Sequence, residues 1–305
     1  MFKYLAFGMQ IHSGFEISGL YPSTSLESGN TVHVELGKVP ESLINEVLEV
    51  KPFSTYNENE FIFNIPETAK YYITNGTKVV IEPLTDNFEE VLFYFYTGVL
   101  ATVLFQKNIL PLHVSGIKLK NNTVMLFAGH QRAGKSSTSI MLQNMGYLPF
   151  TDDTAVLDVE NGICYAHASY PIIRAMEKTL ERQQVYSEDK IKPVIGEGFK
   201  YGINFHEKFT EQKLPVSGIV FISEEGDEVT VSTMKAAEAI KLLKFNIYRK
   251  QWVSGMKKEM LQFKTISSIA QSQVHFFSAK RPWEADSFET FAQAIEEQII
   301  SQIGN

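Results

Sequence analysis

Cysteine is almost absent from this chain of 305 residues, which contains only Cys164. A single cysteine excludes an intramolecular disulfide framework and a zinc site built from several cysteines. The chain also shows no positively charged start followed by an apolar core and a small-residue cleavage site, so we expect no secretory signal. Both features are typical of a protein in a reducing compartment, and we expect a cytoplasmic location.

An excess of positive charge and a long hydrophobic run are also missing. Lys and Arg number 28 against 35 Asp and Glu, which gives a formal net charge of −7. An acidic protein has no bulk electrostatic attraction to nucleic acid or to an anionic membrane, so we expect neither as a partner. The longest uncharged stretch, 91–106, is shorter than the roughly 20 residues that a spanning helix needs. We interpret it as a buried core helix.

The first hundred residues predict short strands, because β-favouring residues alternate or cluster there. The expected strands are Phe2–Gln10, Val32–Leu36, Glu60–Ile65, Lys70–Thr74 and Lys78–Glu82. Asn75-Gly76 predicts a hairpin, since both residues tolerate positive φ. Asn87–Phe105 has the pattern of a helix with acidic residues in its first turn. We therefore expect a smaller β-rich domain over residues 1–105.

Strands and helices are mixed in the remaining residues, 106–305, which we expect to form a second domain. Hairpins are predicted across 120–122 and across Asn161-Gly162. The other expected strands include Tyr147–Phe150, Lys213–Ser223 and Val274–Ser278, and the expected helices are Lys135–Met145, Met234–Tyr248, Met256–Gln271 and Ser287–Ile303. The predicted fold class is α/β with a mixed sheet.

The most specific motif lies between an apolar strand and a helix. The residues that match G-x-x-x-x-G-K-[ST] are Gly129, His130, Gln131, Arg132, Ala133, Gly134, Lys135 and Ser136. In such a P-loop the glycines let backbone N–H groups turn toward phosphate oxygens, and the helix N-terminus adds positive potential. Lys135 is expected to reach the β- and γ-phosphates, and the Ser136 hydroxyl to bind Mg²⁺. We expect residues Gly129 to Ser137 to contact the nucleotide.

Two adjacent carboxylates, Asp152 and Asp153, follow the next predicted strand, 17 and 18 residues after Lys135. One helix and one strand separate them from the P-loop, which predicts that they lie beside it. Adjacent side chains at a strand end point in different directions. One carboxylate can therefore serve Mg²⁺ while the other faces an acceptor hydroxyl; an Asp turn or helix cap is the plain alternative.

Other polar residues carry weaker signals. His113 lies between Leu112 and Val114 in a predicted strand, 112–119, where a lone histidine is more often a polar core residue than a catalyst. His130 is expected to face solvent. The basic residues Arg174, Lys280 and Arg281 could reach phosphate, but we interpret each as a solvated surface charge.

Taken in order, these segments resemble a known family. The histidine strand with Leu112-His113, the loop 129–136, and Gly146-Tyr147 leading to Asp152-Asp153 resemble the catalytic domain of HPr kinase/phosphorylase. The whole chain is similar to the wider family of HPr-kinase-related serine kinases, although only residues 110–160 are specific.

The resemblance implies a P-loop kinase with a PEP-carboxykinase-like fold, which carries the loop on a mixed sheet. It implies ATP and Mg²⁺ as cofactors, Lys135 as the phosphate-contacting lysine, and Ser136 and Asp152 as Mg²⁺ ligands. Asp153 would accept the proton of a serine hydroxyl in a protein or peptide, and His113 would assist electrostatically. Hexamers occur in that family, so a homo-oligomer is an open expectation.

Two departures from the family pattern leave two alternatives open. HPr kinases follow the Asp pair with a Glu-containing, Gly-rich segment, whereas this chain has Ser169 to Arg174 followed by Glu177. An Arg-Pro-Gly-Arg-like segment is also missing from the sequence. The alternatives are a nucleotide-binding regulatory module with reduced catalysis, and a kinase of a small molecule.

Overall fold

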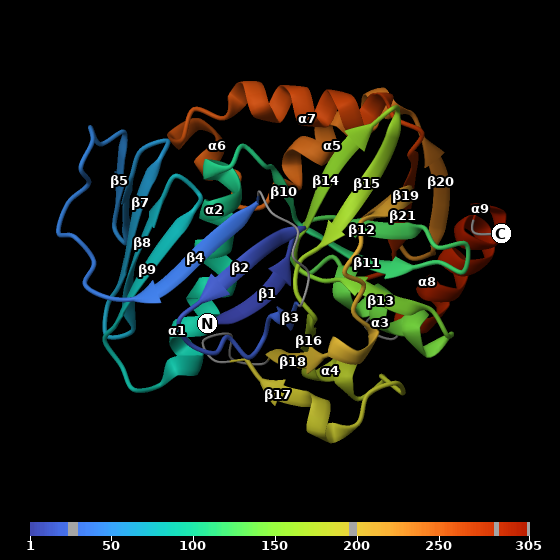
Figure 1. The fold of residues 1–305 in the computed structure, drawn as a ribbon. Coiled ribbons are helices and arrows are strands. Elements are labelled where there is room, and N and C mark those ends of the chain that lie inside the picture. The colour runs from blue at the N-terminus through green and yellow to red at the C-terminus, as the bar shows by residue number, and fades with distance from the viewer. Residues whose placement is uncertain (24–29, 195–199, 284–286, 304–305) are drawn as a thin grey trace. The chain divides into compact units, whose positions relative to one another are not determined.

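The computed structural model describes residues 1–23, 30–194, 200–283 and 287–303 (Figure 1). The described residues form two compact units. One comprises 1–23, 30–111 and 248–263, and the other comprises 112–194, 200–247, 264–283 and 287–303. The domain boundary between residues 105 and 106 stays a prediction.

A nine-stranded sheet forms most of the first unit, in the order β3-β1-β2-β4-β9-β8-β7-β6-β5. Strands β2, β4 and β9 run parallel, and the other neighbours are antiparallel. The strands are β1 (Phe2–Ala6), β2 (Met9–Ser13), β3 (Tyr21–Pro22), β4 (Thr31–Leu36), β5 (Glu49–Lys51), β6 (Ser54–Tyr56), β7 (Glu60–Ile65), β8 (Ala69–Thr74) and β9 (Lys78–Pro83).

Left-handed residues make the tight turns of this sheet. Asn75 and Gly76 have φ of 53° and 63°, and the hairpin predicted there joins β8 to β9. Phe7 and Gly8, with φ of 54° and 70°, form a second such turn. The single strand predicted for Phe2–Gln10 is therefore wrong, because this turn divides it into the antiparallel pair β1 and β2.

The apolar segment after β9 is helical from Phe88 to Gln106, as α1 (Phe88–Tyr94), a π-helical stretch (Phe95–Val99) and α2 (Leu100–Gln106). The helix predicted for Asn87–Phe105 is thus confirmed. With 19 residues the helix is long and apolar enough to cross a membrane, but the core helix of a soluble protein passes the same test, and 67% of the tested window is buried. The hydroxyl of Tyr71, on β8, donates to the carbonyl of Val91, in α1, at 2.8 Å, and this hydrogen bond links the helix to the sheet.

A mixed sheet forms the centre of the second unit, in the order β10-β14-β15-β19-β12-β11-β13, with β21 beside β19 and β20 beside β21. Strand β19 runs parallel to β12 and β21, whereas β11 and β12 form an antiparallel hairpin. The expected mixed α/β class is confirmed. The strands are β10 (Pro111–Leu112), β11 (Val114–Lys118), β12 (Val124–Ala128), β13 (Leu148–Thr151), β14 (Ala155–Glu160), β15 (Ile163–Ala168), β19 (Leu214–Glu224), β20 (Thr230–Met234) and β21 (His275–Arg281).

A small sheet, β16-β18-β17, was missed by the sequence analysis. Its strands are β16 (Ile172–Met176), β17 (Ile191–Pro193) and β18 (Lys200–Asn204). The helices elsewhere are α3 (Lys135–Asn144), α4 (Glu177–Leu180), α5 (Ala236–Phe245), α6 (Gln251–Gly255), α7 (Glu259–Gln271), α8 (Phe288–Ile295) with a π-helical continuation (Glu296–Ile300), and α9 (Ser301–Ile303), with short 3₁₀ turns at Glu188–Lys190 and His206–Lys208.

The core of the second unit brings α3 and α8 together on the sheet. The helical segment near the C-terminus buries Phe291, Ile295 and Ile299, which recur at helical spacing and pack in one cluster with residues of β12 and β19. Packing against both α8 and the sheet holds α3, and therefore the loop that precedes it, in one orientation.

Candidate functional site

The loop 129–134 joins the end of β12 to the start of α3. Gly129 has a φ of +153°, and a Cβ atom there would lie 2.5 Å from the Ile222 carbonyl oxygen of β19. Gly134 has a φ of +100° at the N-cap of α3. Both glycines of the motif thus have backbone conformations that residues with a side chain rarely adopt. At Gly129 there is also no room for a side chain.

The side chain of Lys135 folds back onto this loop. Its Nζ donates to the carbonyl oxygens of Gly129 and His130, at 3.1 Å each. Burial lowers the pKa of Lys135, while the charges of Asp152 and Asp153 oppose that shift. The ammonium group therefore binds the start of the loop and lies within the electrostatic influence of the acidic pair.

The other loop residues differ in exposure. His130, as expected, faces solvent, as do Gln131 and Arg132, whereas Ala133 is buried. The hydroxyl of Ser137 forms a 2.9 Å hydrogen bond with that of Thr179 on α4. The nucleotide contacts expected of these residues stay predictions.

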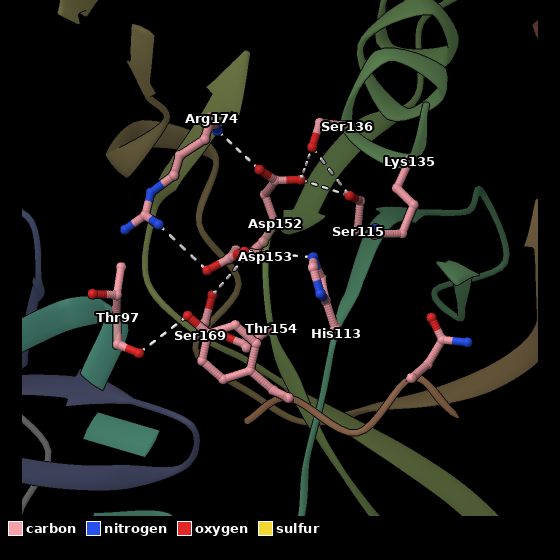
Figure 2. Close-up of polar contacts among 12 residues, drawn as sticks. Thr97, His113, Ser115, Lys135, Ser136, Asp152, Asp153, Thr154, Ser169 and Arg174 are labelled. Carbon is pink, nitrogen blue, oxygen red and sulfur yellow. Dashed lines mark hydrogen bonds and ion pairs between the residues drawn. The ribbon is translucent and has the colours of Figure 1, made fainter. Parts of the chain in front are cut away.

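Asp152 is buried directly beside the P-loop serine (Figure 2). Its Oδ1 accepts hydrogen bonds from Ser136 Oγ at 2.8 Å and from Ser115 Oγ at 2.6 Å, and its Oδ2 accepts one from the backbone N–H of Arg174 at 2.8 Å. Burial raises the pKa of Asp152, although these hydrogen bonds act in the opposite direction. Ser115, on β11, was missed by the sequence analysis, and its place two residues after His113 was the one available signal.

Asp153 points away from Asp152, as two consecutive residues at a strand end are expected to do. It has a φ of +64°, an unusual conformation for a residue other than glycine. Arg174 Nη1 lies 3.4 Å from its Oδ2, and His113 Nε2 lies 3.7 Å from its Oδ1. Burial acts to raise the pKa of Asp153, but Arg174, His113, Lys200 and Lys135 together lower it below 3.8.

His113 lies in a break between two strands. The continuous strand predicted for 112–119 is wrong, because His113 separates β10 from β11 and its N–H donates to the Asn246 carbonyl at 2.7 Å. Burial lowers the pKa of His113 to about 4, with Lys135, Lys200 and Arg174 adding to the shift and Asp153 opposing it. The imidazole is therefore neutral at pH 7 in the free protein.

The interpretation of Arg174 and Arg281 as solvated surface charges is wrong. Arg174 is only 8% exposed and binds both aspartates, one through its backbone N–H and the other through its guanidinium (Figure 2). Arg281 is 3% exposed and pairs with Glu224. Lys280 does lie at the surface, 44% exposed and paired with Glu225. The burial of Arg174 was not foreseen because β16 was not predicted, although Ile172 and Ile173 favour a strand.

The oxygen atoms around Asp152 are suited to one kind of metal. Ser136, Ser115 and Asp152 supply hydroxyl and carboxylate oxygens, the hard donors that Mg²⁺ prefers, and Mg²⁺ is commonly held by one or two carboxylates together with substrate phosphates. In the described part of the chain, no group of three or more His, Cys, Asp or Glu residues is placed to hold a metal ion. The site thus fits a magnesium–nucleotide complex better than a metal cage made by the protein alone.

Comparison with known proteins gives a limited result. No protein-family model matches the chain, and no curated protein matches it. Among solved structures, it is similar to the Hpr(Ser) kinase/phosphatase from Coxiella burnetii, with 11% sequence identity and a TM-score of 0.33. The match covers 63% of this chain and 97% of that one. A likeness of this degree is a loose similarity of fold, so the chemistry of the site depends on its own residues.

Proposed function

We propose that the protein is a phosphotransferase that moves the γ-phosphoryl group of ATP to a hydroxyl, with serine of a protein or peptide as the expected acceptor. One observation carries this proposal. The hydroxyl of Ser136, which follows the P-loop lysine, donates to Asp152 at 2.8 Å, and Asp153 is the next residue. Groups suited to a triphosphate and groups suited to a hydroxyl are thereby adjacent.

The loop and the start of α3 form the nucleotide end of the site. The first N–H groups of a helix have no partner within it, so those of α3 are available to phosphate oxygens. When the nucleotide binds, Lys135 Nζ leaves the carbonyl oxygens of Gly129 and His130 and donates to oxygen atoms of the β- and γ-phosphates. Ser136 and Asp152 would hold Mg²⁺, which neutralises charge on the phosphates when bound.

Asp153 acts at the acceptor end. Its lowered pKa keeps it ionised at neutral pH, so the carboxylate accepts a hydrogen bond from the acceptor hydroxyl and then takes its proton. A weakly basic carboxylate is sufficient because the transition state of phosphoryl transfer is loose, and catalysis depends mainly on position and charge. General-base assistance of this kind contributes about 10²–10⁴-fold. Arg174 holds Asp153 in place, and neutral His113 borders it.

Two substitutions test the assignment. Lys135→Ala is expected to abolish nucleotide turnover, whereas Asp153→Asn is expected to keep magnesium–ATP binding and lose transfer. Transfer is measured with labelled ATP and a lysate of the source organism, followed by identification of the labelled species. Lys280→Ala, at an exposed ion pair with Glu225, is the control and should behave as the unmodified protein. Transfer at the unmodified rate by Asp153→Asn would refute the role of that carboxylate.

One observation favours a nucleotide-binding regulatory module instead. Both oxygens of Asp152 already accept hydrogen bonds from protein donors, and Asp153 is already ion-paired. A module of this kind would bind ATP saturably and give neither a labelled protein nor hydrolysis above background. A labelled metabolite in the same lysate would indicate a small-molecule kinase.

A further inference from the structure

Asn246 lies immediately after α5 and is 4% exposed. Its Oδ1 accepts a hydrogen bond from the N–H of Gly129 at 2.8 Å, and its Nδ2 donates to the Leu242 carbonyl at 2.8 Å. Its backbone carbonyl accepts the N–H of His113 at 2.7 Å. One buried residue, distant in sequence, thus contacts both the first glycine of the P-loop and the histidine beside Asp153.

The contact with Gly129 bears on the whole loop. Glycine is the most flexible residue, so an unsupported glycine at the start of a loop samples many conformations. The Asn246 oxygen fixes the amide of Gly129, and the carbonyl of the same glycine accepts a hydrogen bond from Lys135 Nζ at 3.1 Å. A short chain of hydrogen bonds therefore runs from α5 through Gly129 to the lysine.

The contact with His113 bears on the acidic side. His113 lies outside regular strand structure between β10 and β11, and the adjacent Leu112 forms an isolated bridge with Ile247. The end of α5 therefore supports the chain on both sides of the site.

We propose that Asn246 is a positioning residue that holds the P-loop in its nucleotide-binding conformation and places His113 relative to it. This inference rests on the proposed function. Loss of the Asn246 side chain leaves the Gly129 N–H without its acceptor, so the loop spends less time in the binding conformation. The apparent dissociation constant rises by the inverse of the fraction that remains competent.

The test is Asn246→Ala, with magnesium–ATP binding measured by calorimetry. The expected loss of affinity is about 5- to 150-fold, the effect of leaving one buried donor unpaired. In the transfer assay KM rises with little change in kcat, because the hydrogen bonds of the side chain go to the Gly129 N–H and the Leu242 carbonyl and not to Asp153. Hydrogen exchange should show lost protection at the Gly129 amide. Asn246→Asp, which keeps an acceptor oxygen, should restore that protection.

Asn144→Ala is the matched control. Asn144 ends α3, and its side chain also bonds two backbone groups, donating to the Arg182 carbonyl and accepting from the Gln184 N–H, both at 2.9 Å. It should lower stability in a similar way and leave nucleotide affinity unchanged.

Three results would overturn the proposal: equal affinity in Asn246→Ala and the unmodified protein, an equal loss in Asn144→Ala, or an unprotected Gly129 amide in Asn246→Asp. If Asn246→Ala does not fold, the exchange measurement on Asn246→Asp decides alone. Absence of magnesium–ATP binding by the unmodified protein would refute the proposed function. Gly129 exchange in the variants would still show whether Asn246 holds the loop.

Discussion

Replacing Arg174 with glutamine would change the surroundings of Asp153 and leave those of Asp152 as they are. The backbone N–H that binds Asp152 remains in Arg174→Gln, whereas the guanidinium beside Asp153 is lost. The variant therefore removes one positive charge beside Asp153, the proposed acceptor side, and leaves the contacts of Asp152, the proposed magnesium ligand, intact. We expect lower stability and slower transfer, with magnesium–ATP affinity unchanged.

The magnitude follows from the burial of the pair. Arg174 and Asp153 are 8% and 19% exposed, with Nη1 and Oδ2 3.4 Å apart. Opposite charges near this distance attract by about 4 kcal/mol at an effective dielectric constant of 20, and removing one partner of a buried pair costs about 3–5 kcal/mol. Arg182→Gln is the control, because its pair with Glu289 at 3.5 Å is 26% and 50% exposed. Such exposed pairs contribute about 0–1 kcal/mol.

The pH dependence identifies the group responsible. Asp153 has a lowered pKa in the folded protein, so its stabilising contribution is present above 3.8 and is lost as the pH falls through the folded value. Arg174 is the largest of the charges that lower the pKa of Asp153, so this pKa rises in Arg174→Gln, and the penalty of the substitution disappears as the carboxyl is protonated.

Denaturant unfolding at pH 7 and below pH 3.8 measures the difference in the free energy of unfolding between Arg174→Gln and the unmodified protein. A pH-independent difference, or one no larger than that of Arg182→Gln, would refute this reasoning. The transfer rate of Arg174→Gln should also need a higher pH to reach its plateau, since the proposed mechanism uses Asp153 in its ionised form.

Three further predictions concern separate features. Gly129→Ala should abolish magnesium–ATP binding in calorimetry, because its Cβ would lie 2.5 Å from the Ile222 carbonyl oxygen; retained binding would show that the loop rearranges freely. The ring of His113 should titrate near pH 4 in NMR spectra and stay neutral from pH 6 to 8, and a value near 6.5 would contradict the effect of burial. In the first unit, buried Glu60 accepts hydrogen bonds from Tyr72 and neighbouring groups, which overcome the effect of burial and lower its pKa to about 2. Glu60→Gln should therefore lower the free energy of unfolding by about 3 kcal/mol at pH 7. This difference should vanish as the pH falls from 4.5 through about 2. Equal unfolding of the variant and the unmodified protein at pH 7 would contradict the lowered pKa of Glu60.

Local chemistry explains which elements the sequence could predict. Asn75-Gly76 and Asn161-Gly162 both adopt positive φ and form the expected hairpins, because few other residue pairs tolerate that conformation. The spacing of Phe291, Ile295 and Ile299 predicts a buried helix face, since these residues lie on one side of any helix that contains them. Each signal lies within a few residues of the structure that it predicts.

Elements whose cause lies elsewhere in the chain were missed. Phe7 adopts a φ of 54°, which is unusual for phenylalanine, so the turn before Gly8 has a weak local signal. The break at His113 arises from a hydrogen bond to Asn246, which no pattern near residue 113 reveals. The strand β16 is only five residues long, and its partner β18 begins at Lys200, more than twenty residues further along the chain.

The same distinction governs the site. A P-loop motif is local, so the sequence could identify Lys135, Ser136 and the nearby acids as candidates. Their protonation depends on burial and on partners from other segments. The family resemblance implies electrostatic assistance from His113, but burial keeps that imidazole neutral at pH 7, whereas the guanidinium of Arg174 is always charged. The largest charge effect on Asp153 therefore comes from Arg174, a residue without a motif, and deleting that charge should harm transfer more than replacing His113 with a neutral hydrogen-bonding residue.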